Sequence, residues 1–306
     1  MTHPPDRTLP GIALMLVFCV TAPLMDVSAK LASATVPVGQ ITMARFLLQG
    51  LIMLPVVWGM GLSLRVPRRH AAMLGLRALC LILATFSFVA AISVMPLADA
   101  LAISFIEPFI LLILGKMIFG DEVGPRRIAA CGVGFAGAML VIQPSLMVFG
   151  TVALLPLVTA FTFAFYMLVT RAISQAMHPV VMQASTSVAG VLFCLPVMIL
   201  ASGSGSATLD PVMPQGLAWV WLLGVGVWAA VSHICVTYAL KFAPSATLAP
   251  LHYFEIVTAV ALGFAVFGDF PNALTWAGIG VICGSGLYVI HRERLAARRR
   301  AAASRG

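Results

Sequence analysis

The chain repeats itself over a long apolar stretch. Residues 91–142 and 239–290 align with each other without a gap, and many aligned positions are identical. The identical pairs are Ala91/Ala239, Pro96/Pro244, Ala98/Ala246, Glu107/Glu255, Leu114/Leu262, Gly115/Gly263, Phe119/Phe267, Gly120/Gly268, Asp121/Asp269, Gly132/Gly280 and Val133/Val281. In each copy one carboxylate, Glu107 or Glu255, lies inside an otherwise apolar run. This pattern indicates a protein made of two related apolar halves, each with one ionisable group near its centre.

The composition places these halves in a membrane. Of the 306 residues, 61% are hydrophobic and only 9% are charged, and the mean hydropathy is +1.06. Soluble domains carry about 25% charged residues. The chain therefore has too few charges to cover a water-facing surface, and we predict an integral membrane protein.

Ten apolar stretches are long enough to cross a bilayer as helices, because a transmembrane helix needs roughly 17–25 residues. We therefore expect an all-α membrane protein with ten transmembrane helices. The predicted spans are 11–32, 39–60, 72–94, 97–118, 127–143, 149–170, 180–201, 217–239, 246–267 and 273–290.

The basic residues predict the orientation. With both termini in the cytoplasm, nearly all Lys and Arg residues, Arg77 among them, fall on the cytoplasmic side, as the positive-inside rule requires. The exceptions, Lys30 and Arg45, lie within helices. We expect a multi-pass protein of the cytoplasmic (inner) membrane, in which the basic segment 292–306 lies against anionic lipid headgroups. The net charge of +8 then needs no nucleic-acid partner.

The two halves are expected to have opposite orientations. A weaker repeat aligns Lys30 with Arg171 and extends the similarity to the remaining spans. Residues 1–145 and 146–291 then form two five-helix repeats. Because five is an odd number, the second repeat begins on the opposite side of the membrane and is inverted, which is the arrangement that permits alternating access.

The apolar segments also resemble a known family. The ten-span rhythm and the segments "FIEPFILLILGKMIFGDEVGPRR" and "FEIVTAVALGFAVFGDFPNALTWAGIGVICGSGLYVIHRE" resemble the drug/metabolite transporter superfamily, specifically its EamA-type members. The resemblance implies a ten-helix, inverted-repeat carrier with cytoplasmic termini. It is compatible with amino acids, nucleoside-like compounds or vitamins as substrates. Family members often end the turn after the fourth span with Gly-Glu, where this chain has Gly120-Asp121-Glu122.

Two glutamates are expected near the middle of the membrane. Glu107 lies about ten residues and Glu255 about nine residues into its span, so at about 1.5 Å per residue both lie roughly 15 Å deep. An ionisable group at that depth costs about 2.5–3.5 kcal/mol on insertion scales. The two carboxylates are candidates for binding a cationic group or protons, and an interhelical hydrogen bond is the alternative. His252, three residues before Glu255, and His233 in the eighth span are candidate pathway residues. For His233 an interhelical hydrogen bond is the alternative.

Three more charged residues lie in the first two spans. Asp26 and Lys30 are four residues apart on one helix, and Arg45 lies on the next span. Arg45 can bind a substrate carboxylate with two hydrogen bonds. The alternative is a neutral Asp26–Lys30 or Asp26–Arg45 pair that locks the helices or acts in gating. Five acidic residues are expected to be solvated or to cap helices at the ends of spans. These are Asp99, Asp121, Glu122, Asp210 and Asp269.

Prolines and aromatic residues lie beside the charged positions. Pro108 and Pro250 are expected to bend their helices. Tyr253 with the pair Phe105 and Phe109 can form an apolar cage for an organic molecule. Small residues at Gly132-x-x-x-Ala136 and Gly280-x-x-x-Gly284 predict close helix packing within the chain or, as the alternative, a homodimer seam.

These features predict a secondary active transporter of a small organic metabolite, driven by a proton or substrate gradient. The chain has no G-x-x-x-x-G-K-[ST] phosphate loop and no spacing typical of a metal site, so we expect neither an enzyme nor a cofactor or metal. A membrane-embedded enzyme acting on lipid-linked substrates and a passive channel are the two alternatives.

Overall fold

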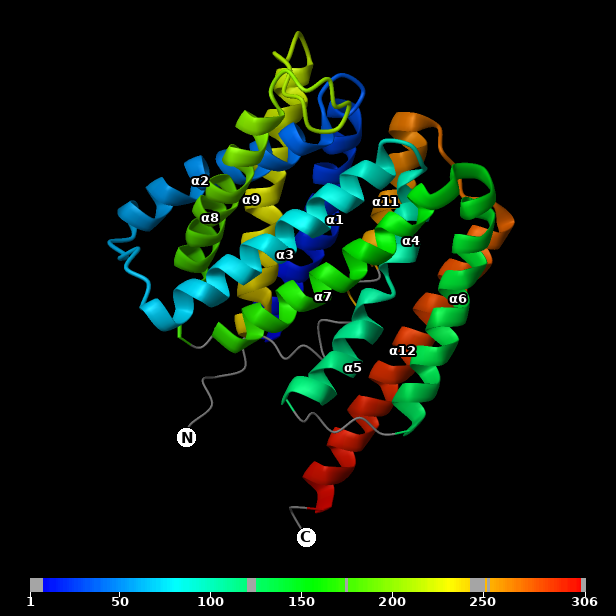
Figure 1. Cartoon of the computed structure of the whole chain (residues 1–306). Coiled ribbons are helices and arrows are strands. Elements are labelled where there is room, and N and C mark those ends of the chain that lie inside the picture. The colour runs from blue at the N-terminus through cyan, green and yellow to red at the C-terminus, as the bar shows by residue number, and fades with distance from the viewer. Residues whose placement is uncertain (1–7, 120–124, 174–175, 243–250, 252–253, 304–306) are drawn as a thin grey trace.

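Within the residues that the computed structural model describes (8–119, 125–173, 176–242, 251 and 254–303), every regular element is a helix. Seven helical segments in these ranges are long and apolar enough to cross a membrane, and two further apolar helices are shorter. The chain is therefore an all-α, multi-pass membrane protein (Figure 1). The helices are α1 (Thr8–Ala32), α2 (Val38–Gly59), α3 (Arg68–Ile92), α4 (Leu97–Ser104), α5 (Glu107–Phe119), α6 (Pro125–Phe149), the 3₁₀ helix η1 (Gly150–Leu154), α7 (Leu155–Ile173), α8 (Pro179–Ala201), α9 (Ala218–Phe242), α11 (Phe254–Phe267) and α12 (Ala273–Ala303).

Prolines begin several of these helices. Pro37, Pro67 and Pro96 each stand immediately before a helix with φ between −58° and −56°, and Pro179 is the first residue of α8. Proline fixes φ near −65° and lacks the N–H group that the first helical turn leaves unpaired. The breaks predicted between spans at these positions therefore coincide with helix starts.

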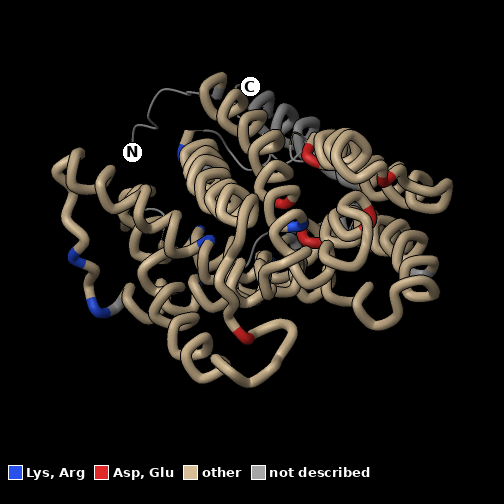
Figure 2. Tube along the Cα trace, turned by 90° about the horizontal axis from the view of Figure 1, so that it is seen from above, with Lys and Arg blue, Asp and Glu red and all other residues tan. Residues whose placement is uncertain are grey.

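Helices distant in the sequence pack in pairs. α1 packs against α9, α2 against α8, α3 against α7, α4 against α11 and α6 against α12. In Figure 1, α3 and α7 run side by side, and α6 and α12 form a pair at one edge of the molecule. Charged residues are sparse along the trace in Figure 2. The long-range pairing brings residues of the two predicted halves together in the interior.

The fourth predicted span is broken into two helices. α4 ends at Ser104 and α5 begins at Glu107, with a turn at Phe105 and Ile106. Pro108 has no N–H to donate to the carbonyl of Ser104, so one helical hydrogen bond is missing where the sequence predicted a bend. The break places Glu107 in the first turn of α5, where the partial positive charge of a helix N-terminus favours a carboxylate.

Glycines bring α6 and α12 together, but they are not the glycines that the sequence indicated. A Cβ atom built on Gly132, Gly280 or Gly284 would meet no atom within 4 Å. A Cβ atom on Gly278, in contrast, would lie 2.8 Å from the carbonyl oxygen of Gly137. The within-chain packing predicted for the two small-residue motifs is therefore wrong, because Gly137 and Gly278 lie on the sides of the helices that face each other.

Candidate functional site

A cavity of about 130 Å³ lies among helices of both predicted halves. An engineered protein cavity of about 150 Å³ binds benzene, so this volume is enough for a small organic group. Aromatic rings cover part of the wall, and the polar side chains come from eight different helices. The polar lining residues are Asp26, Arg45, Thr85, Ser104, Glu107, Thr159, His233 and Glu255.

Arg45 of α2 is the positively charged residue of this wall. Its guanidinium is buried at 2% exposure and donates from Nη1 to the Thr85 hydroxyl and from Nη2 to Nε2 of His233. Its Nε is buried and has no hydrogen-bond partner among the described residues. A guanidinium can only donate hydrogen bonds. Arg45 lines the cavity, and its two hydrogen bonds leave three of its five N–H groups without an acceptor among the described residues.

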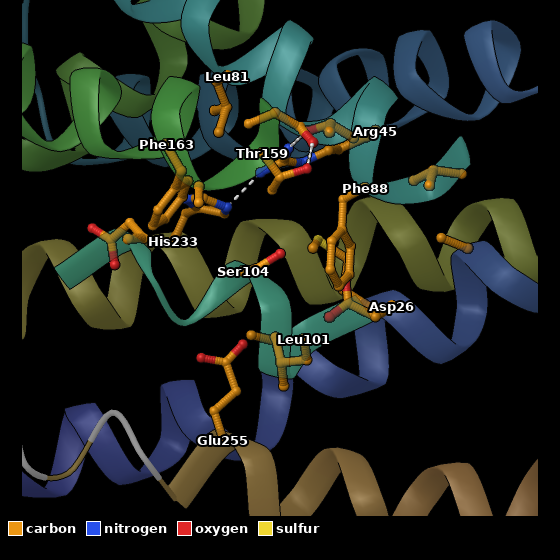
Figure 3. Close-up of a pocket in the computed structure, with 18 of the residues that line it drawn as sticks. Asp26, Arg45, Leu81, Phe88, Leu101, Ser104, Thr159, Phe163, His233 and Glu255 are labelled. Atoms are coloured by element: carbon orange, nitrogen blue, oxygen red, sulfur yellow. Dashed lines mark hydrogen bonds between the residues drawn. The ribbon is translucent and has the colours of Figure 1, made fainter. Parts of the chain in front are cut away.

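Three buried carboxylates share the cavity with Arg45. Asp26 of α1, Glu107 of α5 and Glu255 of α11 line the wall at 5%, 7% and 6% exposure. Figure 3 shows Glu255 across the cavity from Arg45 and His233. The cavity thus presents groups of both charge signs, separated by its width.

One predicted aromatic residue faces the cavity and another does not. Phe105 lines the wall together with Phe18, Phe88 and Phe163. Phe109 instead packs against α6 at Gly134, where an added Cβ atom would collide with its ring. Phe105 and Phe109 thus have different surroundings, and the cage that they would form with Tyr253, which lies outside the described residues, stays a prediction.

Three predicted site residues cannot be placed. His252, Tyr253 and Pro250 lie outside the described residues. Their roles in the pathway or in bending the helix stay predictions.

Lys30 pairs with a residue that the sequence did not suggest. Its Nζ lies 2.9 Å from Oδ2 of Asp269 and 3.1 Å from the Met95 carbonyl oxygen, and it stands 4.6 Å from the centre of the Phe267 ring. The predicted Asp26–Lys30 pair is therefore wrong, because the end of α11 brings a carboxylate from the other half to the end of α1. Asp269 is accordingly ion-paired rather than simply solvated.

The structure likewise replaces the Asp26–Arg45 pair. The two Nη atoms of Arg45 contact Thr85 and His233, and no Asp26–Arg45 ion pair forms. The sequence gave His233 as a pathway candidate with an interhelical hydrogen bond as the alternative. The structure places it on the cavity wall and in a hydrogen bond between α9 and α2.

Two residues assigned to the membrane surface are buried. Asp99 is 6% exposed, and its Oδ1 has no partner among the described residues. Arg77 is fully buried, ten residues into α3, rather than in a cytoplasmic segment. Arg77 is buried because side chains of α7 and α8 surround its guanidinium, whereas Asp99 lies in the first turn of α4, at a helix end as predicted.

Comparison with proteins of known sequence places these features in a family. The EamA-like transporter family model matches the chain twice, over residues 9–143 and 150–290. A riboflavin transporter of Rhizobium johnstonii is 26% identical over 79% of this chain and 78% of its own length. An S-adenosylmethionine uptake transporter of Rickettsia prowazekii is 23% identical over 94% of both chains, and a pseudopaline exporter of Pseudomonas aeruginosa is 26% identical over 89% of this chain and 93% of its own.

A solved crystal structure shows the same fold. It covers 95% of this chain and 97% of its own chain with a TM-score of 0.65 and 19% identity. The two family matches together span nearly the whole chain, and they include every described helix that lines the cavity. The chain therefore belongs to the EamA-like transporter family of the drug/metabolite transporter superfamily and is a membrane transporter of a small metabolite.

Proposed function

We propose that this chain is a secondary active carrier that binds a small zwitterionic or cationic metabolite in the central cavity and exposes it to the two sides of the membrane in turn. The energy would come from a gradient of protons or of a second substrate. The observation that carries the proposal is the buried cavity itself, which holds one arginine and three carboxylates between helices of both halves.

The charges favour a zwitterion. Arg45 has an unpaired N–H for an anionic group, and Glu255 lies across the cavity for a cationic one. Charged groups buried in a membrane protein commonly mark substrate and ion pathways. The aromatic rings between them suit an apolar body joining the two charged ends.

The pairing of the helices supports the proposal of ten spans in two inverted repeats. If α1, α2, α3, α4–α5 and α6 correspond to α7, α8, α9, α11 and α12, then α2–α8, α6–α12 and α4–α11 are contacts of equivalent helices. Two further contacts also have equivalents, since α1–α9 corresponds to α7–α3 and α2–α9 to α8–α3. A twofold relation between the halves produces this pattern. The two family matches, 9–143 and 150–290, fall on the same halves.

The proposed location is the cytoplasmic membrane with both termini inside. An even number of spans returns the chain to its starting side, and in Figure 1 the start of α1 and the end of α12 point toward the same side of the molecule. The arginine-rich end of the chain fits the cytoplasmic leaflet.

The names of the relatives support an organic metabolite as the substrate. They name riboflavin, S-adenosylmethionine and pseudopaline, and one relative is named for uptake and another for export. The proposal for this chain is accordingly limited to the chemical class.

Counterflow tests the proposal. Purified protein in proteoliposomes would be preloaded with unlabelled pools of amino acids, vitamins or nucleoside derivatives and diluted into the same labelled compounds. A carrier produces transient accumulation of label above its equilibrium level, and this accumulation saturates with concentration. Label that only equilibrates without overshoot would contradict the carrier and favour a channel. Liposomes containing the double variant Arg45→Gln/Glu255→Gln are the matched control.

A further inference from the structure

We propose that Arg77 is a positioning residue for substrate binding: through Tyr166 and Gln183 it fixes His233, and His233 in turn orients Arg45 to bind an anionic group in the cavity. The inference rests on the proposed function, because it assigns a task to the wall of the same cavity. Arg77 does not line the cavity itself.

Arg77 is saturated with neutral partners. Its Nε donates to the Thr170 hydroxyl at 2.8 Å, and its two Nη atoms donate to the hydroxyls of Thr186 and Tyr166 and to Oε1 of Gln183. Its guanidinium also lies over the Tyr166 ring, 4.4 Å from the ring centre. These contacts use all five N–H groups of the side chain. Arg77 therefore has no donor left for a ligand, unlike Arg45.

The Gln183 amide connects Arg77 to the backbone of α9. Because a guanidinium only donates, the amide oxygen of Gln183 must face Arg77 and the amide nitrogen must face the other way. That nitrogen donates to the carbonyl of His233 at 3.0 Å and to the Thr237 hydroxyl at 3.1 Å. Arg77 thus determines which end of the amide meets α9, and this contact holds the backbone of His233.

The same reasoning determines the protonation of the His233 ring. Arg45 donates to Nε2, so Nε2 must carry a lone pair and the proton of the neutral ring must be on Nδ1. Nδ1 lies 3.2 Å from the Tyr166 hydroxyl, which also accepts from Arg77 at 2.7 Å. The tyrosine oxygen accepts both hydrogen bonds. The direction of each hydrogen bond from Arg77 to Arg45 is therefore fixed.

These hydrogen bonds orient the guanidinium of Arg45, and the residues that provide them lie on helices other than α2. Thr85 holds Nη1 and His233 holds Nη2, which leaves the other N–H groups of this cavity-lining side chain without an acceptor among the described residues. If the His233 ring carried its proton on Nε2, this N–H would point at the Nη2–H of Arg45. The two donors would repel each other, and Nη2 would lose its partner. A carboxylate or a phosphate oxygen is the chemistry that fits the remaining N–H groups of Arg45.

Nuclear magnetic resonance of histidine nitrogens tests the first link. Protein labelled with ¹⁵N-histidine would be studied in lipid nanodiscs at neutral pH, and His233→Asn would identify the resonances of His233. The wild-type protein should show His233 neutral with the proton on Nδ1. Tyr166→Phe removes the acceptor of the Nδ1 proton and should shift the Nδ1 resonance, while the proton stays on Nδ1 because Arg45 still donates to Nε2. Tyr238→Phe outside the network should leave the ring unchanged. A wild-type ring with the proton on Nε2, or no change in Tyr166→Phe, would overturn the proposal.

Anion binding tests the second link, with acetate as the probe. Thermal unfolding in nanodiscs would be followed against sodium acetate, with sodium chloride at equal ionic strength as the reference. Acetate should raise the Tm of the wild-type protein, and Arg45→Gln should abolish this shift. Arg77→Met and Tyr166→Phe should raise the acetate concentration for half-maximal effect about tenfold, as expected for the loss of one oriented charged hydrogen bond.

Arg65→Met, at an exposed position before α3, is the matched control and should behave as the wild type. A wild-type Tm that acetate does not raise, or an unchanged half-maximal concentration in both network variants, would refute the assignment. Neither measurement uses transport. Failure of the counterflow test with intact acetate binding would therefore disprove the carrier and keep the positioning role. Successful counterflow without the expected acetate effects would keep the carrier and disprove the positioning role.

Discussion

Glu107 and Glu255 are buried carboxylates in the interior of a membrane protein, and Glu107 lies in the first turn of α5. A helix N-terminus has a partial positive charge that favours a carboxylate by typically 0.3–1 kcal/mol, and up to about 2 kcal/mol when partly buried. This is less than the roughly 2.5–3.5 kcal/mol that insertion scales assign to a charge at mid-membrane. A proton or a cationic ligand at either carboxylate would offset part of the cost of burying its charge in the membrane.

The first prediction concerns these two glutamates. Glu107→Gln and Glu255→Gln should each lower the initial rate of transport about tenfold or more and flatten its pH dependence, because glutamine keeps the shape of glutamate but carries neither charge nor proton. The amount of folded protein should change little. The measurement is initial uptake into proteoliposomes over a range of pH, with Asp210→Asn in the loop before α9 as the control. If both glutamine variants transport like the wild type at every pH, the carboxylates are structural.

Among the elements, α1 and α11 are joined by the Lys30–Asp269 ion pair. The two side chains are 16% and 30% exposed, and exposed ion pairs contribute only about 0–1 kcal/mol. The carbonyl of Met95 and the ring of Phe267 add further contacts to the ammonium group. A contact of this modest strength holds the ends of the helices together and can still break within a transport cycle.

Reversal of the pair tests its role. Lys30→Asp and Asp269→Lys should each slow transport about tenfold, since each places two like charges together at the end of α1. The double variant Lys30→Asp/Asp269→Lys restores opposite charges and should recover most of the rate. Initial rates of counterflow measure this, and Lys116→Asp on the exposed side of α5 serves as the control. A double variant no better than the single ones would exclude a direct pairing in the cycle.

For the whole molecule, the central expectation is that the two halves lie in opposite orientations with both ends of the chain in the cytoplasm. A protease site added after Gly306 should resist protease that is added outside cells with an exposed cytoplasmic membrane. The same site should be cut in inside-out membrane vesicles, whose cytoplasmic face points outward. A protease site in the loop at Ser204 should show the opposite behaviour, because an odd number of predicted spans separates the two positions. Cleavage of the C-terminal site from outside would refute the proposed topology.

The sequence was sufficient for the helices but not for the contacts between them. Span length and proline positions predicted where helices begin, and Pro108 predicted the break in the fourth span. The contact between Lys30 and Asp269 joins residues of different halves, so local spacing carried no information about it. Arg77 was placed at the surface because the positive-inside rule considers only where a charge lies relative to the ends of spans. It contains no information about the hydroxyl and amide groups of other helices that surround this guanidinium in the interior. The surroundings of Phe109 could not be predicted, because the rotation at the break depends on how α5 packs.

During synthesis of the chain, Arg77 is made before all of its hydrogen-bond partners. All of its partners follow it in the sequence by 89 to 109 residues, and the carboxylate that pairs with Lys30 follows by 239 residues. During synthesis α3 enters the membrane well before the side chains that will surround its guanidinium have been made. A nascent chain that ends before α7 has none of them, so its buried arginine must stay near water or lipid headgroups until the second half arrives. Final burial of α3 is therefore a late step in biogenesis, and the first half alone is not a folding unit.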